Sequence, residues 1–187
     1  MELLIIVGFI LIVGLVILGI HNTIISRFNR CKQAWSDVLA YTRQRENIIP
    51  KLEEMAEQFK NYEGEILKSV TELRNSLSAL QNKGAEFDVE ALAKVQQVSR
   101  GITATFEDYP ELQSAGLYQS FMKELSSQES NIGAAIVIYN SNVQEHNTGI
   151  EQFPNSWVNA KFTNKVKIEE FSDTKSSEEF DYKPNFS

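Results

Sequence analysis

The sequence predicts an all-α protein with one N-terminal transmembrane helix, an antiparallel bundle of roughly four helices and a partly mobile C-terminal tail. Three observations predict this fold. An uncharged apolar block, Leu3–Ile20, opens the chain. From there to residue 152 the apolar residues recur at helical steps of three, four or seven, with only Pro50 and Pro110 as interruptions. After Pro154 the composition changes. We therefore expect an anchor over 1–20, a bundle over 21–153 and an aromatic-rich extension over 154–187.

The block from Leu3 to Ile20 is long enough to cross a bilayer. As a helix its 18 residues span roughly 27 Å, close to the hydrocarbon thickness of a membrane. A cleaved signal peptide and a buried core helix are the competing interpretations. A signal peptide needs positive charge ahead of the apolar run and small residues at a cleavage site, and neither is found. We expect an uncleaved single-pass anchor that spans the membrane from Leu3 to Ile20.

Charge on the two sides of the anchor predicts its orientation. The 31 residues that follow it contain six basic and two acidic residues. They are Arg27, Arg30, Lys32, Arg43, Arg45 and Lys51 against Asp37 and Glu46. The positive-inside rule then places the bundle in the cytoplasm and the N-terminus outside.

One apolar stripe follows Pro50 and predicts a helix over 52–80. Its members are Leu52, Met55 or Ala56, Phe59, Ile66, Val70, Leu73, Leu77 and Leu80. Gly84 offers a left-handed cap after this helix. Pro50 either follows a turn, in the first turn of a new helix, or kinks one long helix.

Two further helices complete the bundle. Asp88 is the expected N-cap of a helix that carries Leu92, Val95, Ile102 and Phe106 on one face. Pro110 suits the first turn of the next segment. The last helix has a stripe that ends before Pro154, comprising Phe121, Leu125, Ile132, Ala135 or Ile136, Tyr139, Val143, Ile150 and Phe153. Gln128 and His146 fall on its seam, where we expect hydrogen-bonded or partly exposed side chains.

The C-terminal extension is rich in aromatic residues. Counted from residue 153, seven aromatic residues lie in this part of the chain, namely Phe153, Trp157, Phe162, Phe171, Phe180, Tyr182 and Phe186. We expect residues 153–171 to dock on the bundle and residues 172–187 to be mobile, because Ser, Asp, Lys and Glu dominate there. The alternative is a mobile segment whose aromatic side chains meet a partner or the membrane interface.

The composition argues against enzymatic, metal and nucleic-acid functions. A net charge of −7 disfavours phosphate backbones as partners. One cysteine and two histidines leave little material for metal or acid–base chemistry, and neither histidine has a Glu three residues before it. Phosphate-binding loops and Gly-flanked nucleophilic serines are also missing. We expect no catalytic residue, no metal ligand and no cofactor.

Several separated motifs run along the chain in a set order. They are Ala34-Trp35-Ser36, Arg45 with Ile48-Ile49-Pro50 and Leu52, Tyr109-Pro110-Glu111-Leu112, Glu124-Leu125 with Glu129 and Asn131-Ile132, Tyr139-Asn140 with Val143, Asn147-Thr148, Ile150 and Phe153-Pro154. Together they resemble the LemA family of bacterial membrane proteins, over about residues 1–170. The chain departs from that family at Leu39 and Lys51, where Asp and Asn are more frequent.

The resemblance implies a helical bundle behind one membrane helix, in the bacterial cytoplasmic (inner) membrane, and it implies no enzyme. The expected partners are the bilayer and another membrane protein, for which an HtpX-type membrane protease is one candidate. Assembly of the chain into a homo-oligomer is a further possibility. Two functions compete. One is a non-enzymatic membrane-anchored scaffold. The other is a receptor or regulator of an associated membrane protease, which binds a small molecule or peptide between helices.

The motif positions are the candidate site, as structural or partner-facing residues. They are Trp35, Arg45, Pro50, Tyr109, Pro110, Tyr139, Asn140, Asn147, Phe153 and Pro154. Asn140 and Asn147 lie seven residues apart, hence on one helical face. They either bond to another helix or face a partner.

Overall fold

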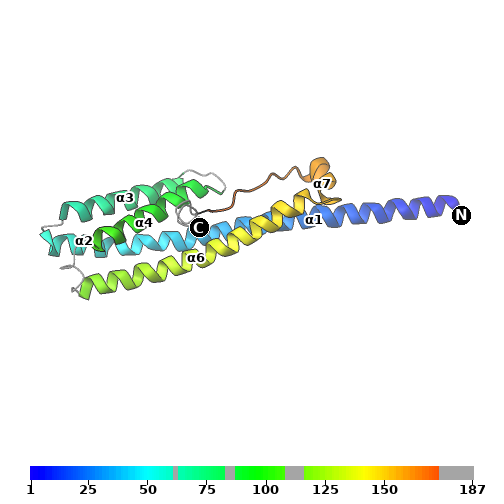
Figure 1. Ribbon diagram of the computed structural model, residues 1–187. Helices are drawn as coiled ribbons and strands as arrows, with labels where there is room; N and C mark the ends of the chain where they lie inside the picture. The colour runs from blue at the N-terminus through cyan, green and yellow to red at the C-terminus, as the bar shows by residue number, and fades with distance from the viewer. Residues whose placement is uncertain (61–62, 83–86, 108–115, 173–187) are drawn as a thin grey trace, which may run out of the picture. The chain divides into compact units, whose positions relative to one another are not determined.

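The computed structural model describes residues 1–60, 63–82, 87–107 and 116–172 (Figure 1). All regular elements in these ranges are helical, which confirms the all-α fold. In chain order they are α1 (Glu2–Arg43), the 3-10 turn η1 (Gln44–Ile48), α2 (Ile49–Gln58), α3 (Glu63–Asn82), α4 (Val89–Glu107), α6 (Gly116–Glu151), α7 (Asn155–Val158) and the π-helical turn η3 (Asn159–Thr163).

The helices form two compact units, and α6 contributes to both. The first unit contains Met1–Gln44 and Ser127–Glu169. The second contains Arg45–Ser126 and the described residues from Glu170 onward.

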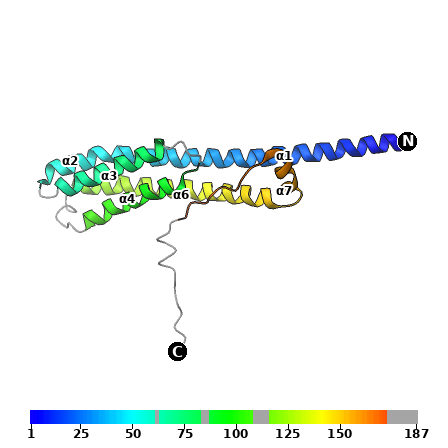
Figure 2. The same ribbon diagram turned by 90° about the horizontal axis from the view of Figure 1, so that it is seen from above.

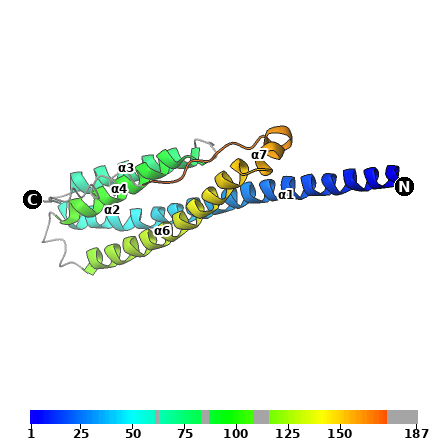
Figure 3. The ribbon, with the colours of Figure 1, turned by 45° about the vertical axis from the view of Figure 1, so that its right-hand side comes forward.

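In the first unit, α1 runs for 42 residues without a break. Its first part is apolar and exposed, and the most apolar 18-residue window has no buried residue. The helix is therefore long and apolar enough to cross a membrane. Figures 1, 2 and 3 show this part extending past α7 with no neighbour beside it. From Ile24 onward α1 has a buried stripe at helical steps, which includes Phe28, Cys31, Trp35 and Val38.

The second unit is a small helical bundle made of α2, α3, α4 and the start of α6. Its α2 packs on α3, and α3 packs on α4 (Figure 1). The ring centroids of Phe106 in α4 and Phe121 in α6 lie 5.4 Å apart. The bundle core is aliphatic and aromatic, and its buried members include Leu52, Met55, Ile66, Leu73, Leu77, Leu92, Val95, Ile102, Phe106 and Phe121. This agrees with the predicted bundle of roughly four helices.

The predicted single helix over 52–80 is wrong, because the chain breaks between α2 and α3. The break begins at Phe59, which caps α2 with φ −114° and ψ 67°. Phe59 and Ile66 are seven residues apart, so their spacing fits an unbroken helix as well as two packed ones. Breaking the chain there lets the α2 stripe pack on that of α3.

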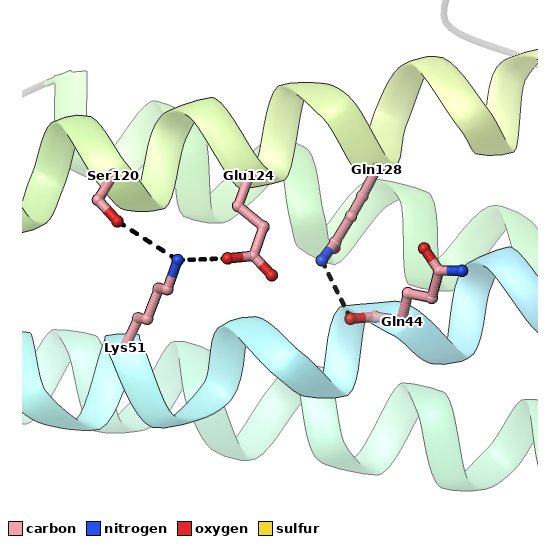
Figure 4. Close-up of polar contacts among 5 residues, drawn as sticks. All are labelled: Gln44, Lys51, Ser120, Glu124 and Gln128. Atoms are coloured by element: carbon pink, nitrogen blue, oxygen red, sulfur yellow. Dashed lines mark hydrogen bonds and ion pairs between the residues drawn. The ribbon is translucent and has the colours of Figure 1, made fainter.

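Pro50 lies in the first turn of α2, directly after η1. Of the two alternatives for Pro50, the structure shows a new helix that begins next to it, but the segment before that helix is the 3-10 helix η1 and not a non-helical turn. The first N–H groups of a helix have no partner inside it, so the missing N–H of proline costs nothing there. In the first unit, the Gln128 side chain donates from Nε2 to the Gln44 carbonyl at 3.0 Å, at the end of α1 (Figure 4).

Other helix ends follow the sequence signals. Asp88 Oδ1 accepts a hydrogen bond from the Ala91 N–H at 2.9 Å, which confirms Asp88 as the N-cap of α4. The last long helix, α6, ends at Glu151, before Pro154 as predicted. Gly84, Pro110 and residues 173–187 lie outside the described residues, and so does the predicted mobile tail apart from Ser172.

Candidate functional site: the strap held on α6

The motif face of α6 binds an extended segment of the same chain. This segment, Asn164–Glu169, is called the strap here; it follows η3 and belongs to the first unit. Ile168 in the strap is buried. The expected docking of residues 153–171 is therefore confirmed for the strap.

Two asparagine side chains bind the strap backbone in the same way. Asn147 in α6 donates from Nδ2 to the Ile168 carbonyl and accepts the Ile168 N–H at Oδ1, both at 2.9 Å. Asn159 in η3 makes the same pair of 2.9 Å bonds with Lys165. A side-chain amide has the donor and acceptor arrangement of a peptide group, so each asparagine bonds like a neighbouring strand. The strap is not paired with a strand, so these side-chain bonds give its backbone N–H and C=O groups the partners that a neighbouring strand would otherwise provide.

Two more α6 side chains bond to strap carbonyls. Tyr139 Oη donates to the Glu169 carbonyl at 2.8 Å, and His146 Nε2 bonds the Val166 carbonyl at 3.1 Å. A carbonyl oxygen only accepts, so His146 carries its proton on Nε2. Tyr139, His146 and Asn147 are spaced seven and eight residues apart, hence on one helical face.

Aromatic side chains of α1 lie against this α6 face. The ring centroids of Trp35 and Tyr139 are 5.2 Å apart with the rings tilted by 51°. Phe28 lies 5.5 Å from the His146 ring. Lys165 Nζ lies 3.9 Å from the centroid of Phe28, a cation–π distance. The motif residues Trp35 and Tyr139 therefore join α1, α6 and the strap.

His146 is fully buried in this cluster, and the pKa of its imidazole is lowered. Loss of water around the ring is the main cause. The bond to the Val166 carbonyl works in the opposite direction, while the charges of Lys165 and Arg27 lower the pKa further. His146 is thus neutral in the folded protein at pH 7. The expectation of a hydrogen-bonded seam holds for both His146 and Gln128.

Cys31 is fully buried in the same unit. Burial raises the pKa of its thiol to about 11, with a smaller contribution from the charge of Glu145. Thiolate is the reactive form, so this thiol is unreactive while the protein is folded.

Other motif residues lie in the second unit. Arg45 is fully buried and donates from Nη2 to Gln96 Oε1 at 2.6 Å. Lys51, where the LemA family more often has Asn, reaches α6 and bonds to Glu124 and Ser120 (Figure 4). The lysine at this position, which departs from the family pattern, thus forms an ion pair with the motif residue Glu124.

The remaining motif positions are distributed as follows. Tyr109 and Pro110 lie outside the described residues. Asn140 is half-buried on α6, and the contact that Asn147 makes is with the strap rather than with a second helix. The predicted place of Phe153 on the apolar stripe of the last helix is wrong, because α6 ends at Glu151 and the Phe153 side chain is 85 % exposed. Pro154 is the N-cap of α7.

Sequence reasoning missed Asn159 and the strap-binding role of His146. The strap does carry a short alternation of polar and apolar residues, Lys165-Val166-Lys167-Ile168-Glu169, which is typical of an extended segment and was overlooked. Its hydrogen-bond partners on α6 lie about 20 or more residues away in sequence and have no such signal. A usable signal exists in retrospect, because Asn159 and Asn164 bracket the short η3 turn. Asn164 has a positive φ of 47°, which asparagine tolerates better than most residues.

The side chains of Tyr139, His146, Asn147 and Asn159 are thus arranged to bind backbone groups, and their donors and acceptors bond to the strap of the same chain. Among the described residues, no group of three or more His, Cys, Asp or Glu side chains is placed to hold a metal ion.

Comparison with known proteins agrees with the motifs. The pattern of the LemA family matches residues 34–185. Protein LemA of Metamycoplasma hominis is 30 % identical over 154 residues, which cover 81 % of this chain and 68 % of that protein. The chain therefore belongs to the LemA family.

Proposed function

We propose that this LemA-family protein is a non-enzymatic, membrane-anchored interaction protein that presents its helices to another membrane protein. One observation carries the proposal: α1 continues without a break from its exposed apolar part into its pairing with α6. Its 42 residues correspond to roughly 63 Å of helix. A continuous helix transmits the position of the anchor to the α1–α6 pair, as a scaffold requires.

A shallow groove between α1 and α6 is the proposed contact surface. It is lined by Ala34, Asp37, Tyr41, Asn131, Ala134, Ala135 and Ile138. Ile138 is 57 % exposed, and Val137 beside it is 69 % exposed. Alanines let a second helix backbone approach closely, and the exposed aliphatic side chains give it apolar surface to bury. The proposed occupant is an amphipathic helix of another membrane protein, for which an HtpX-type protease is the candidate from the family resemblance.

The proposed location is the bacterial cytoplasmic membrane, with a single pass, the N-terminus outside and the helical units in the cytoplasm. The support is the six basic residues that follow the apolar segment.

Purification of the full-length protein in mild detergent tests this function. We expect a stoichiometric membrane-protein partner with wild type, and its loss with Ala134→Arg, which places a long charged side chain in the groove. Gln144→Arg is the matched control, because Gln144 is exposed on α6 and does not line the groove.

Three other outcomes contradict the proposal. Partner retention by Ala134→Arg would rule out the groove as the contact surface. A complex whose mass equals two copies of this chain would make the occupant a second copy. A folded, partnerless monomer that a small molecule stabilises would instead support the receptor function.

A further inference from the structure

The residues around α7 carry an exposed group of aromatic side chains. Trp157 in α7 is 50 % exposed and Phe162 in η3 is 55 % exposed, and their rings meet edge-on with centroids 6.1 Å apart. Phe153, just before α7, is 85 % exposed. These three residues are called the aromatic foot. Large apolar side chains exposed as a group mark a binding surface.

The aromatic foot is attached next to the end of the apolar segment of α1. Val158 of α7 is buried together with Ile24 and Ile150, and Ile17 and Ile20 pack against this cluster. Both α7 and η3 contact α1, and the views agree that α7 lies beside it (Figures 1 and 2). From Ile17 to Ile24 the helix advances by only about 11 Å. The foot therefore lies at the level where the apolar segment ends.

That level has a known chemistry if α1 crosses a bilayer. An apolar segment that ends at Ile20 places the boundary between hydrocarbon and headgroups near Ile20. Trp and other amphipathic aromatic side chains are enriched at this boundary, because the ring is apolar and the indole N–H bonds to headgroups or water. Lys161 is exposed next to Phe162 and has the charge that phosphate headgroups attract.

We propose that the aromatic foot inserts into the interfacial layer of the same bilayer that α1 crosses. The chain then contacts the membrane twice, once through the spanning helix and once through residues more than 130 positions later in the sequence. Interfacial aromatic anchors set the tilt and rotation of a membrane helix. The foot would thus fix how the α1–α6 groove is turned relative to the membrane. This inference relies on the anchor of the proposed function and is independent of its partner.

Fluorescence of Trp157 in reconstituted full-length protein tests the foot. Trp35→Phe leaves Trp157 as the single tryptophan, since the chain has two. The protein is placed in phosphatidylcholine–phosphatidylglycerol vesicles that carry bromine either near the glycerol backbone or near the chain ends. We expect Trp157 emission to be blue-shifted and strongly quenched by the shallow bromine, and less by the deep bromine. If Trp35→Phe fails to fold, the difference between wild type and Trp157→Phe gives the same signal.

A second exposed position controls for exposure alone. In a chain without Trp35 and Trp157, Val137→Trp places the indole on α6, about 20 Å along the helix from Ile150. Emission from that position should stay unquenched by either lipid. Quenching equal to that of Trp157 would overturn the inference, because both sites would then contact lipid alike.

The two proposals fail in different ways. Protein that floats with the vesicles while Trp157 emits at long wavelength without quenching overturns the foot and leaves the anchor intact. Protein that does not float with the vesicles overturns the anchor, and the foot with it.

Discussion

The side-chain amide of Asn147 forms two hydrogen bonds with the backbone of Ile168, one as donor and one as acceptor, each 2.9 Å long. This contact joins α6 to a segment 21 residues further along the chain. It gives the Asn147 motif position a physical role in holding the strap.

Asn147→Ala should release the strap from α6. Two bonds are lost and the Ile168 backbone groups lose their partner, which we expect to cost about 1–3 kcal/mol of unfolding free energy. Hydrogen exchange should show faster exchange of the Ile168 amide. Asn142→Ala is the control, because the Asn142 side chain bonds to the carbonyl of Ile138 in its own helix. Unchanged Ile168 protection in Asn147→Ala would contradict the assignment.

Stability should fall as the pH drops below about 6.5, the ordinary pKa of histidine. The pKa of His146 is lowered by burial, so the unfolded chain takes up a proton at a pH where the folded chain does not. The stability contributed by neutral His146 is full above the unfolded pKa and is lost as the pH falls toward the lower folded pKa.

The slope assigned to His146 is at most about 1.4 kcal/mol per pH unit. Denaturation of His146→Gln, which keeps a neutral donor for the Val166 carbonyl, should show a smaller loss below pH 6.5. A variant with the wild-type slope would mean that other groups cause the pH dependence.

The Lys51–Glu124 ion pair should be worth more than an exposed pair. Both side chains are about 30 % exposed, and Lys51 also bonds to Ser120 (Figure 4). A double-mutant cycle with Lys51→Met and Glu124→Gln should give a coupling of about 1 kcal/mol. The pair Lys68–Glu72, with side chains 78 % and 54 % exposed, should give almost none. Equal couplings for the two pairs would contradict the prediction.

Cys31 should resist thiol reagents in the folded protein even after the membrane is opened. The thiol is fully buried and its pKa is raised to about 11, so almost no thiolate is present at neutral pH. A maleimide should label Cys31 only after denaturation. Rapid labelling in native detergent-solubilised protein would show that the α1–α6 pair opens.

Most of the helical fold follows from apolar spacing. Ile132, Tyr139 and Val143 were placed on one face by their steps of seven and four, and all three are buried. The break at Phe59 was not predictable, because a step of seven to Ile66 fits both one helix and two. The predicted boundary between the anchor and the bundle lies at residue 20, whereas α1 continues there without a break. A local signal for this continuity exists, because no glycine or proline lies between Ile20 and Arg43.

The site was less predictable than the fold. Asn147 is a candidate because it matches a motif of the LemA family, yet nothing local specifies whether its partner is a helix, a strap or another protein. Its partner is backbone, which carries no sequence signature. The partner of His146 was unpredictable for the same reason, because its acceptor is the backbone carbonyl of Val166.

Labelling from the two sides of the apolar segment tests most directly whether the chain crosses the membrane with its helical units in the cytoplasm. Cys31→Ser removes the native thiol, and Glu2→Cys or Lys68→Cys then supplies a single exposed one. Sealed cells with verified integrity are treated with a membrane-impermeant maleimide, and opened cells serve as the reference. We expect Glu2→Cys to label in sealed cells and Lys68→Cys to label only after opening. Labelling of Lys68→Cys in sealed cells would contradict the cytoplasmic location of the helical units.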